Sequence, residues 1–173
     1  MKKNRGFSLI EMMVIIAIMG ILIAMITPAL YSLFSSSTRG CAMNVDSLIA
    51  KCKVYAMGRS EDVVVMIYKG DDGKIWGEYI EGNKAIGQAE QLGDSRVELS
   101  VTPPGGAAYA PTRAQPLYIS FSKATGGLCL FGDSRDGFFT PASGQLAKID
   151  ITSAGKPYEV SIYATTGKHG VNQ

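Results

Sequence analysis

The sequence predicts an α+β protein in which one long N-terminal helix packs on a head of antiparallel β-sheet. Two observations predict this fold class. The residues from Met12 to Leu30 are apolar almost without interruption, and those from Val45 to Ala56 are apolar at helical spacing. Beyond Gly58 the pattern changes to short β-branched and aromatic runs separated by turn residues. A chain of 173 residues allows one domain plus a membrane helix.

The apolar stretch has the length of a transmembrane segment. Its 19 residues would rise about 28 Å as a helix, close to the roughly 30 Å hydrocarbon core of a bilayer. Lys2, Lys3 and Arg5 precede the stretch, and no basic residue follows until Arg39. This asymmetry predicts a cytoplasmic N-terminus with the rest of the chain outside the cytoplasm.

A single acidic residue, Glu11, stands at the start of the apolar stretch. A carboxylate costs roughly 2.5–3.5 kcal/mol at the middle of a bilayer and less near its interface. Such a residue needs a partner, and we expect a positive charge from another copy of the chain.

The helix is expected to continue to about Met57 and to become amphipathic in its second half. Val45, Leu48, Ile49, Cys52, Tyr55 and Ala56 form its apolar face. Pro28 is expected to kink or locally open the helix, because proline lacks an N–H and clashes with the preceding turn. Gly20 and the Ser35–Thr38 run are further weak points, and Gly58 is a plausible terminator.

Seven strands are expected beyond this helix. A seven-strand head suggests antiparallel sheets whose inner face is covered by the amphipathic half of the helix. Two long loops, 103–116 and 132–144, separate some of the strands. The expected strands are 63–68, 75–80, 97–101, 117–121, 128–131, 147–151 and 159–163.

The N-terminal pattern resembles the type IV pilin family. The resemblance rests on the short basic leader, on Gly6 and Phe7, on Glu11 five residues after the glycine, and on an apolar run that contains Pro28. It implies the pilin fold and a prepilin peptidase that cuts between Gly6 and Phe7 and methylates the new amine of Phe7. It also implies that this amine meets Glu11 of a neighbouring subunit. Ser8 departs from the family's usual threonine and leaves the motif intact.

The resemblance divides the chain into four parts: a leader (1–6), a transmembrane and assembly helix (7–34), an amphipathic half-helix (35–57) and a β-rich head (58–173). The implied location is the inner membrane, with a single pass, followed by a periplasmic or extracellular filament. The implied partners are other pilin or pseudopilin subunits, the prepilin peptidase, the inner-membrane assembly platform and, before assembly, membrane lipid.

Within this family the head resembles the H-type pseudopilins of type II secretion and the FimT-type minor pilins. The matching features are the end of the helix with the strand at Val63, the strands at Phe121 and Ile149, and the closing segment 158–167. This implies a structural subunit, minor or initiating, of a pilus-like or pseudopilus filament. A major pilin and a DNA-binding minor pilin of an uptake pilus are the alternatives.

Two other interpretations of the N-terminus stay open. One is a plain signal anchor that carries a stray acidic residue. The other is an ordinary secretory signal, which would be cleaved after the apolar stretch, near residues 27–30 or 35–37.

Three cysteines leave at least one thiol unpaired within the chain. In one helix, Cys41 and Cys52 would lie about 16 Å apart, too far for a bridge. Any disulfide would therefore join Cys129 to Cys41 or to Cys52. The simpler interpretation is that all three are buried free thiols packed as small apolar groups.

No catalytic set, cofactor motif or metal motif is evident, and no enzyme activity is expected. His169, the only imidazole, is near the C-terminus. The acidic pairs Asp71–Asp72 and Asp133–Asp136 lack the spacing of a calcium loop, and they suit turns. From Gly58 onward 11 basic residues stand against 13 acidic ones, so the head is not a general nucleic-acid surface. DNA is therefore an unlikely partner, and the weakly basic tail at 166–170 is expected to be a frayed, solvated terminus.

Overall fold

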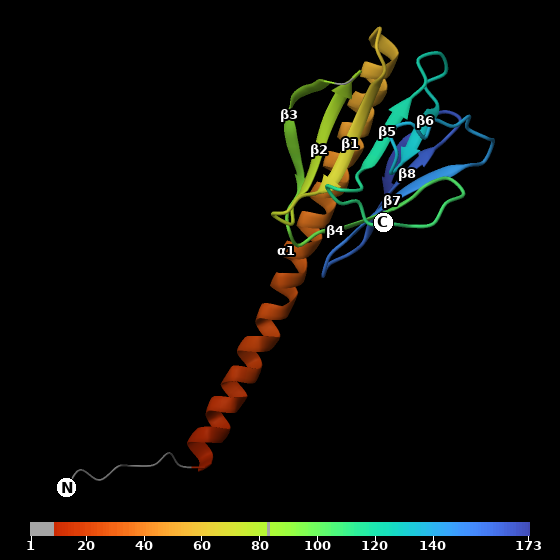
Figure 1. Ribbon diagram of the computed structural model, residues 1–173. Coiled ribbons are helices and arrows are strands. Elements are labelled where there is room, and N and C mark those ends of the chain that lie inside the picture. Colours follow the sequence, from red (N-terminus) through yellow and green to blue (C-terminus); the bar gives the residue numbers. More distant parts are fainter. Residues whose placement is uncertain (1–8, 83) are drawn as a thin grey trace.

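The computed structural model describes the backbone of residues 9–82 and 84–173, and the side chains of the same residues except 26–34. It confirms the α+β class. One helix, α1 (Leu9–Gly58), precedes all the strands. Half of α1 protrudes from the head and the other half lies along it (Figure 1).

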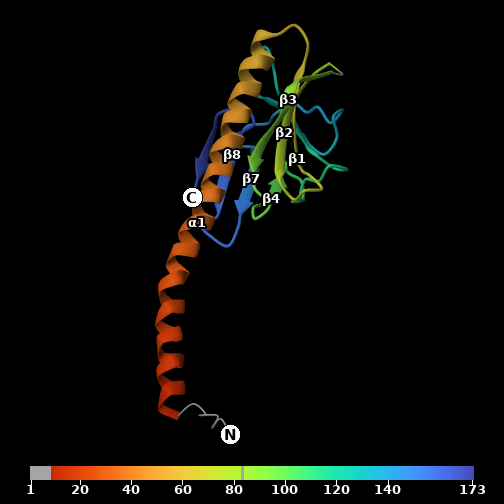
Figure 2. The ribbon, with the colours of Figure 1, turned by 90° about the vertical axis from the view of Figure 1, so that its left-hand side faces the viewer.

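Helix α1 is an unbroken α-helix of 50 residues. The backbone stays helical through Pro28 and through the Ser35–Thr38 run, so the expected local opening at these positions is not present. The axis of the protruding half curves gently (Figure 2). Gly58 is the last helical residue, as expected, and the next residue, Arg59, donates its N–H to Tyr55 O at 3.0 Å.

Nine strands form the head in the described residues, two more than expected. All seven expected strands are present, with small changes at their ends. The strands are β1 (Val63–Lys69), β2 (Ile75–Glu81), β3 (Lys84–Gly93), β4 (Glu98–Thr102), β5 (Leu117–Phe121), β6 (Leu128–Gly132), β7 (Leu146–Thr152), β8 (Tyr158–Tyr163) and β9 (His169–Asn172).

The strands pair into two antiparallel sheets. One sheet has the order β3-β2-β1-β5-β6 and the other β4-β7-β8-β9. The chain crosses between them twice more after β4, because β5 and β6 return to the first sheet and β7 begins the second again. Strand β3 continues the chain from β2 and occupies an edge of the first sheet.

The core lies between the inner faces of the two sheets and helix α1. Alternate residues of each strand point inward, as the two-residue period of a strand requires. In β1, for example, Val63, Val65 and Ile67 have no exposed surface. The expected apolar face of α1 completes this core, and its residues Val45, Leu48, Ile49, Cys52 and Ala56 are at most 1% exposed. The amphipathic half-helix thus packs on the head as predicted.

The expectation of a frayed tail was wrong. Residues 169–172 form β9, which pairs with β8. The turn before it is held by Lys53 of α1, whose Nζ donates to Thr166 O at 2.9 Å and to Gly167 O at 3.2 Å. Gly167 adopts a φ of +59° and its Cα lies so close to Gly126 O that a side chain would collide. The C-terminal hairpin is therefore seated against both the helix and the β5–β6 turn.

Candidate functional site: the protruding helix and its junction with the head

The protruding half of α1 exposes apolar side chains all round. Between Leu9 and Met25 the large apolar residues are 40–80% exposed. A helix that is apolar on every face is stable only when something else covers it. The head makes no such cover, because it lies beside the other half (Figure 2).

The residues of the predicted processing site lie at or beyond the edge of the described chain. Gly6 and Phe7 lie outside the described residues, and so does the side chain of Pro28. Glu11 lies in the first turn of α1 and is exposed. An acidic group in this turn interacts favourably with the positive end of the helix dipole.

Within the part of the chain that the structure describes, no helical segment is both long and apolar enough to cross a membrane.

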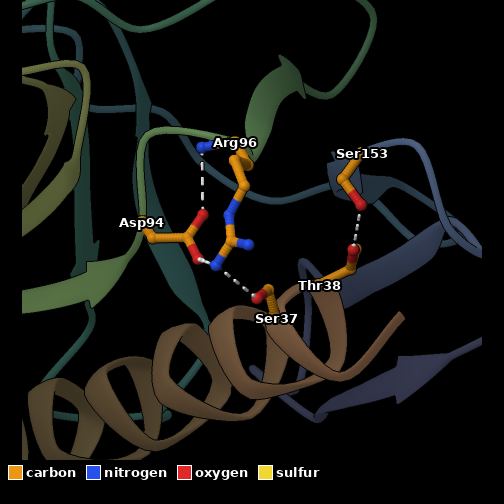
Figure 3. Close-up of polar contacts among 5 residues, drawn as sticks. All are labelled: Ser37, Thr38, Asp94, Arg96 and Ser153. Carbon is orange, nitrogen blue, oxygen red and sulfur yellow. Dashed lines mark hydrogen bonds and ion pairs between the residues drawn. The ribbon is translucent and has the colours of Figure 1, made fainter. Parts of the chain in front are cut away.

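A polar junction fixes the helix at the point where it leaves the head (Figure 3). Arg96, in the turn between β3 and β4, donates from Nη2 to Asp94 Oδ2 at 2.6 Å and to Ser37 Oγ at 3.4 Å. Asp94 Oδ1 also accepts the Arg96 backbone N–H at 2.9 Å. The side-chain hydrogen bond from Arg96 holds the pKa of the Asp94 carboxyl below its usual value. This side of the junction is partly solvated, because the Arg96 side chain is 54% exposed.

The second side of the junction is buried. Thr38 has no exposed surface, and its hydroxyl lies 2.6 Å from Ser153 Oγ in the β7–β8 turn. The helix is therefore tied at Ser37 to the turn that joins the two sheets and at Thr38 to a turn of the second sheet (Figure 3).

Further polar contacts hold the packed half of α1 along its length. Asn44 Nδ2 donates to Leu92 O at 3.0 Å, and Tyr79 OH donates to Leu48 O at 3.3 Å. These contacts and the pair of bonds from Lys53 come from three successive parts of the half-helix. They fix its rotation as well as its position, because each one needs a particular face of the helix.

Sequence reasoning missed the junction. From the sequence alone the Ser35–Thr38 run predicts a weak point of the helix, since serine and threonine are poor helix formers. Thr38 and Ser153 are 115 residues apart, so no local pattern joins them. A usable signal was present: Thr38 is seven residues before Val45 and therefore falls on the same helical face as the buried residues.

The three cysteines are free thiols in the structure, so the disulfide of Cys129 with Cys41 or Cys52 is not formed. Cys52 faces the core, 3.7 Å from Ile119 O. Cys129 lies beside Ser120, the residue after Ile119 in β5, and consecutive strand residues point to opposite faces of a sheet. The five-stranded sheet therefore separates the Cys129 thiol from the Cys52 thiol. Cys41 packs against Gly93 near the junction. Burial raises the pKa of Cys41 and of Cys52 to about 12, which leaves both as neutral thiols.

The acidic loops have partners within the chain. Asp72 Oδ1 accepts the Lys74 N–H and the Trp76 Nε1–H, and Asp133 Oδ2 accepts from Gln115 at 2.7 Å. In the described ranges no group of three metal-ligating side chains is gathered at one point. His169, in β9, has its Nε2 atom 3.9 Å from Asp46 Oδ1 of α1, and its side chain is 15% exposed.

Comparison with known proteins identifies the start of the chain. Residues 1–27 match the family model described as the prokaryotic N-terminal methylation motif. The match covers Gly6, Phe7 and Glu11 and supports the resemblance to type IV prepilins that these residues carry. No curated protein and no solved structure gives a significant match to the chain.

Proposed function

We propose that this chain is a prepilin whose mature form is a structural subunit of a type IV pilus-like filament. One observation carries the proposal. A helix that begins with an N-terminal methylation motif is apolar and exposed along its first half and locked into a folded head along its second. The exposed apolar half of the helix is therefore available to pack against lipid or against other subunits.

The physical argument follows from the exposed apolar surface. Before assembly, lipid covers residues 7–34, which form a single membrane pass with the N-terminus in the cytoplasm. After assembly the same surface packs against the corresponding helices of other subunits. A carboxylate is costly in either apolar environment, and the resemblance to prepilins assigns Glu11 a cationic partner in the filament.

That partner is the α-amine of a neighbouring subunit. Cleavage between Gly6 and Phe7 removes the basic leader and creates the amine on Phe7. Methylation of this nitrogen leaves it able to hold a proton and a positive charge. In an apolar bundle the Phe7 amine of one subunit and the Glu11 carboxylate of the next neutralise each other and set the axial register of the two helices.

The filament is proposed to hold this chain as a minor or initiating subunit, of the H-type pseudopilin or FimT-type class. The support is the order of elements: the amphipathic half-helix, a short loop, β1, and a closing hairpin that contains β8. The filament is either a type II secretion pseudopilus or a type IV pilus. The proposed partners are other pilin or pseudopilin subunits, the prepilin peptidase and the inner-membrane assembly platform.

Processing is the direct test of the proposal. The full chain is co-expressed with a prepilin peptidase, and the membrane-bound product is analysed by intact mass and N-terminal sequencing. The expected mature protein begins at Phe7 and carries added methyl mass, while Gly6→Val remains full-length because a side chain at the cleavage residue obstructs the peptidase. A mature N-terminus within residues 27–38 would instead mean an ordinary secretory signal and would refute the proposal.

A further inference from the structure

The two sheets differ on the faces that they turn away from the core. On the four-stranded sheet this face includes Ser100, Lys148 and Glu159, which alternate with buried residues, and one exposed aromatic residue, Tyr163, at the end of β8. On the five-stranded sheet this face is mixed: it carries Glu78 and, next to the β1–β2 turn, two neighbouring aromatic residues. Tyr68 of β1 and Trp76 of β2 lie directly opposite each other in the strand register, and neither belongs to the core cluster.

A pocket of about 390 Å³ is lined by both rings, of which Trp76 is partly exposed and Tyr68 is only 6% exposed. Its walls are the β1–β2 turn, with Asp71 and Asp72, and Arg113 from the long loop that precedes β5. The volume lies within the range of small-molecule sites, which are typically apolar with a few polar groups at fixed positions.

The rings that form the floor are held in place before any ligand arrives. Trp76 Nε1–H donates to Asp72 Oδ1 at 3.2 Å, and Tyr68 OH donates to Glu78 Oε1 at 2.7 Å. A Cβ at Gly70 would lie 3.0 Å from Trp76 Cδ1, so the absence of a side chain there lets the indole edge approach the turn. Preorganised rings lose little conformational entropy when a ligand binds.

The charges of the pocket select the class of ligand. The carboxylates of Asp71 and Asp72 repel anions. The guanidinium of Arg113, whose Cζ lies 5.8 Å from the centre of the Tyr68 ring, repels cations. A neutral ligand that carries hydroxyl groups can donate to the carboxylate on one wall and accept from the guanidinium on the other. An aromatic floor adds the requirement of a flat apolar face.

We infer that this pocket binds a neutral saccharide, with one sugar ring stacked on Trp76 and its hydroxyl groups between Asp71 and Arg113. A pyranose ring satisfies both requirements, because its C–H bonds form a flat apolar face and its hydroxyl groups lie around the rim. The site is independent of the protruding helix, so it adds a ligand-binding surface to a subunit that is otherwise structural.

Trp76 is the only tryptophan of the chain, so its fluorescence reports on this pocket alone. The full chain, in a detergent without a sugar headgroup, is titrated with cellotetraose and with chitotetraose, and glycylglycine serves as a zwitterionic probe. The expected result is a saturable change of Trp76 emission with at least one saccharide and none with the dipeptide. Saturation by glycylglycine alone, or no saturable change with either saccharide, would overturn the inference.

Two variants locate the binding. Arg113→Ala and Asp71→Asn are each expected to weaken saccharide binding about tenfold, since each removes one hydrogen bond to a charged group. Lys156→Ala, an exposed change in the β7–β8 turn, is the control and should leave the affinity unchanged. Thermal unfolding of each variant checks that the head is intact. Undiminished binding in both folded pocket variants would place the saccharide elsewhere and would also overturn the inference.

Discussion

The two halves of helix α1 belong to one unbroken element and yet meet opposite environments. Leu9 is 80% exposed and Met25 71%, while Leu48 and Ile49 in the packed half are at most 1% exposed. The packed half also has an outer face, where Val54 is 68% exposed. The first half is thus apolar on all sides, and the second is apolar on the side that the head covers.

This difference separates folding from assembly along a single helix. The head supplies every contact that the second half needs, through the apolar face, the junction and the bonds from Lys53. The head does not cover the apolar side chains of the protruding half, which stay exposed. Changes in the second half should therefore affect the stability of the head, and changes in the first half should affect insertion and assembly.

Removing the packed half of α1 should have the largest effect on the folding of the head. A chain that starts at Ser35 keeps the packed half-helix and is expected to be soluble, monomeric and cooperative in thermal unfolding. A chain that starts at Arg59 loses that face. Its larger side chains each contribute about 1.5–3 kcal/mol when fully buried, and their sum is comparable to the roughly 5–15 kcal/mol stability of a whole domain.

The shorter chain should therefore be aggregated or molten, as measured by light scattering and near-ultraviolet circular dichroism. Equal folding of the two truncated chains would mean that the half-helix contributes little to the head, contrary to its burial.

Glu11→Ala should have a large effect on assembly and none on the head. The variant is expected to be inserted and processed normally but to enter filaments poorly, because the Phe7 amine of its neighbour is left without a partner. The measurement is the amount of variant in purified filaments relative to wild type when both are co-expressed. Glu61→Ala, an exposed acidic change in the head, is the matched control. Normal incorporation of Glu11→Ala would contradict the proposed pairing.

Much of this architecture could be predicted from the sequence because its patterns are local. Helical spacing from Val45 to Ala56 and β-branched runs such as 63–68 each identify an element without reference to the rest of the chain. Strand β3 was missed because its sequence, Lys84–Gly93, includes two glycines and several residues that are poor strand formers. It is a strand because it pairs with β2, with two register shifts along the way.

Long-range contacts explain the other omissions. Strand β9 is only four residues long and depends on pairing with β8, and the junction joins Thr38 to Ser153. Neither has a periodic signal. The motif residues Gly6 and Glu11 could be named because they act within eleven residues of the N-terminus, whereas the pocket at Trp76 needs a turn, a strand pair and a distant loop to meet.

Leu48→Ala and Val54→Ala compare the two faces of the packed half. Leu48 is 1% exposed and packs against Gly77 of β2, so its truncation is expected to cost about 2–5 kcal/mol in the free energy of unfolding. Val54 is on the outer face, and its change to alanine should stay within about 0.5 kcal/mol. Denaturant unfolding of the chain that starts at Ser35 gives both values. Similar losses for the two variants would show that the outer face is also covered.

Thr38→Val tests the buried side of the junction. The change keeps the shape of the side chain and removes its hydrogen bond with Ser153, so we expect a loss of about 0.5–1.5 kcal/mol. Ser36→Ala, an exposed change two residues earlier, should be close to neutral. The loss should be measured by denaturant unfolding of the same truncated chain. A neutral Thr38→Val would mean that apolar packing alone fixes the helix at this point.

Replacing Asp94 should have the smallest effect on stability, and the direction in which this effect changes with pH follows from the Asp94 pKa. The Arg96 side-chain hydrogen bond lowers the pKa of Asp94 in the folded protein, while the unfolded chain has a value near 3.9. The folded state therefore binds the proton less readily. The contribution of Asp94 is fully present above the unfolded pKa and is lost as the pH falls through the folded one. Because the pair is partly solvated, its contribution should be below about 1 kcal/mol.

Asp94→Asn should lower the melting temperature slightly at pH 7, and the difference from wild type should shrink as the pH falls below 4. Melting curves of both proteins from pH 7 to pH 2.5 measure this difference. Asp136→Asn is the matched control, because Asp136 is exposed and lies in the loop between β6 and β7 rather than in the junction turn. If the difference in melting temperature grew at acid pH, Asp94 would be harder to ionise in the folded head than in the unfolded chain. Arg96 would then hold Ser37 without help from the Asp94 carboxylate.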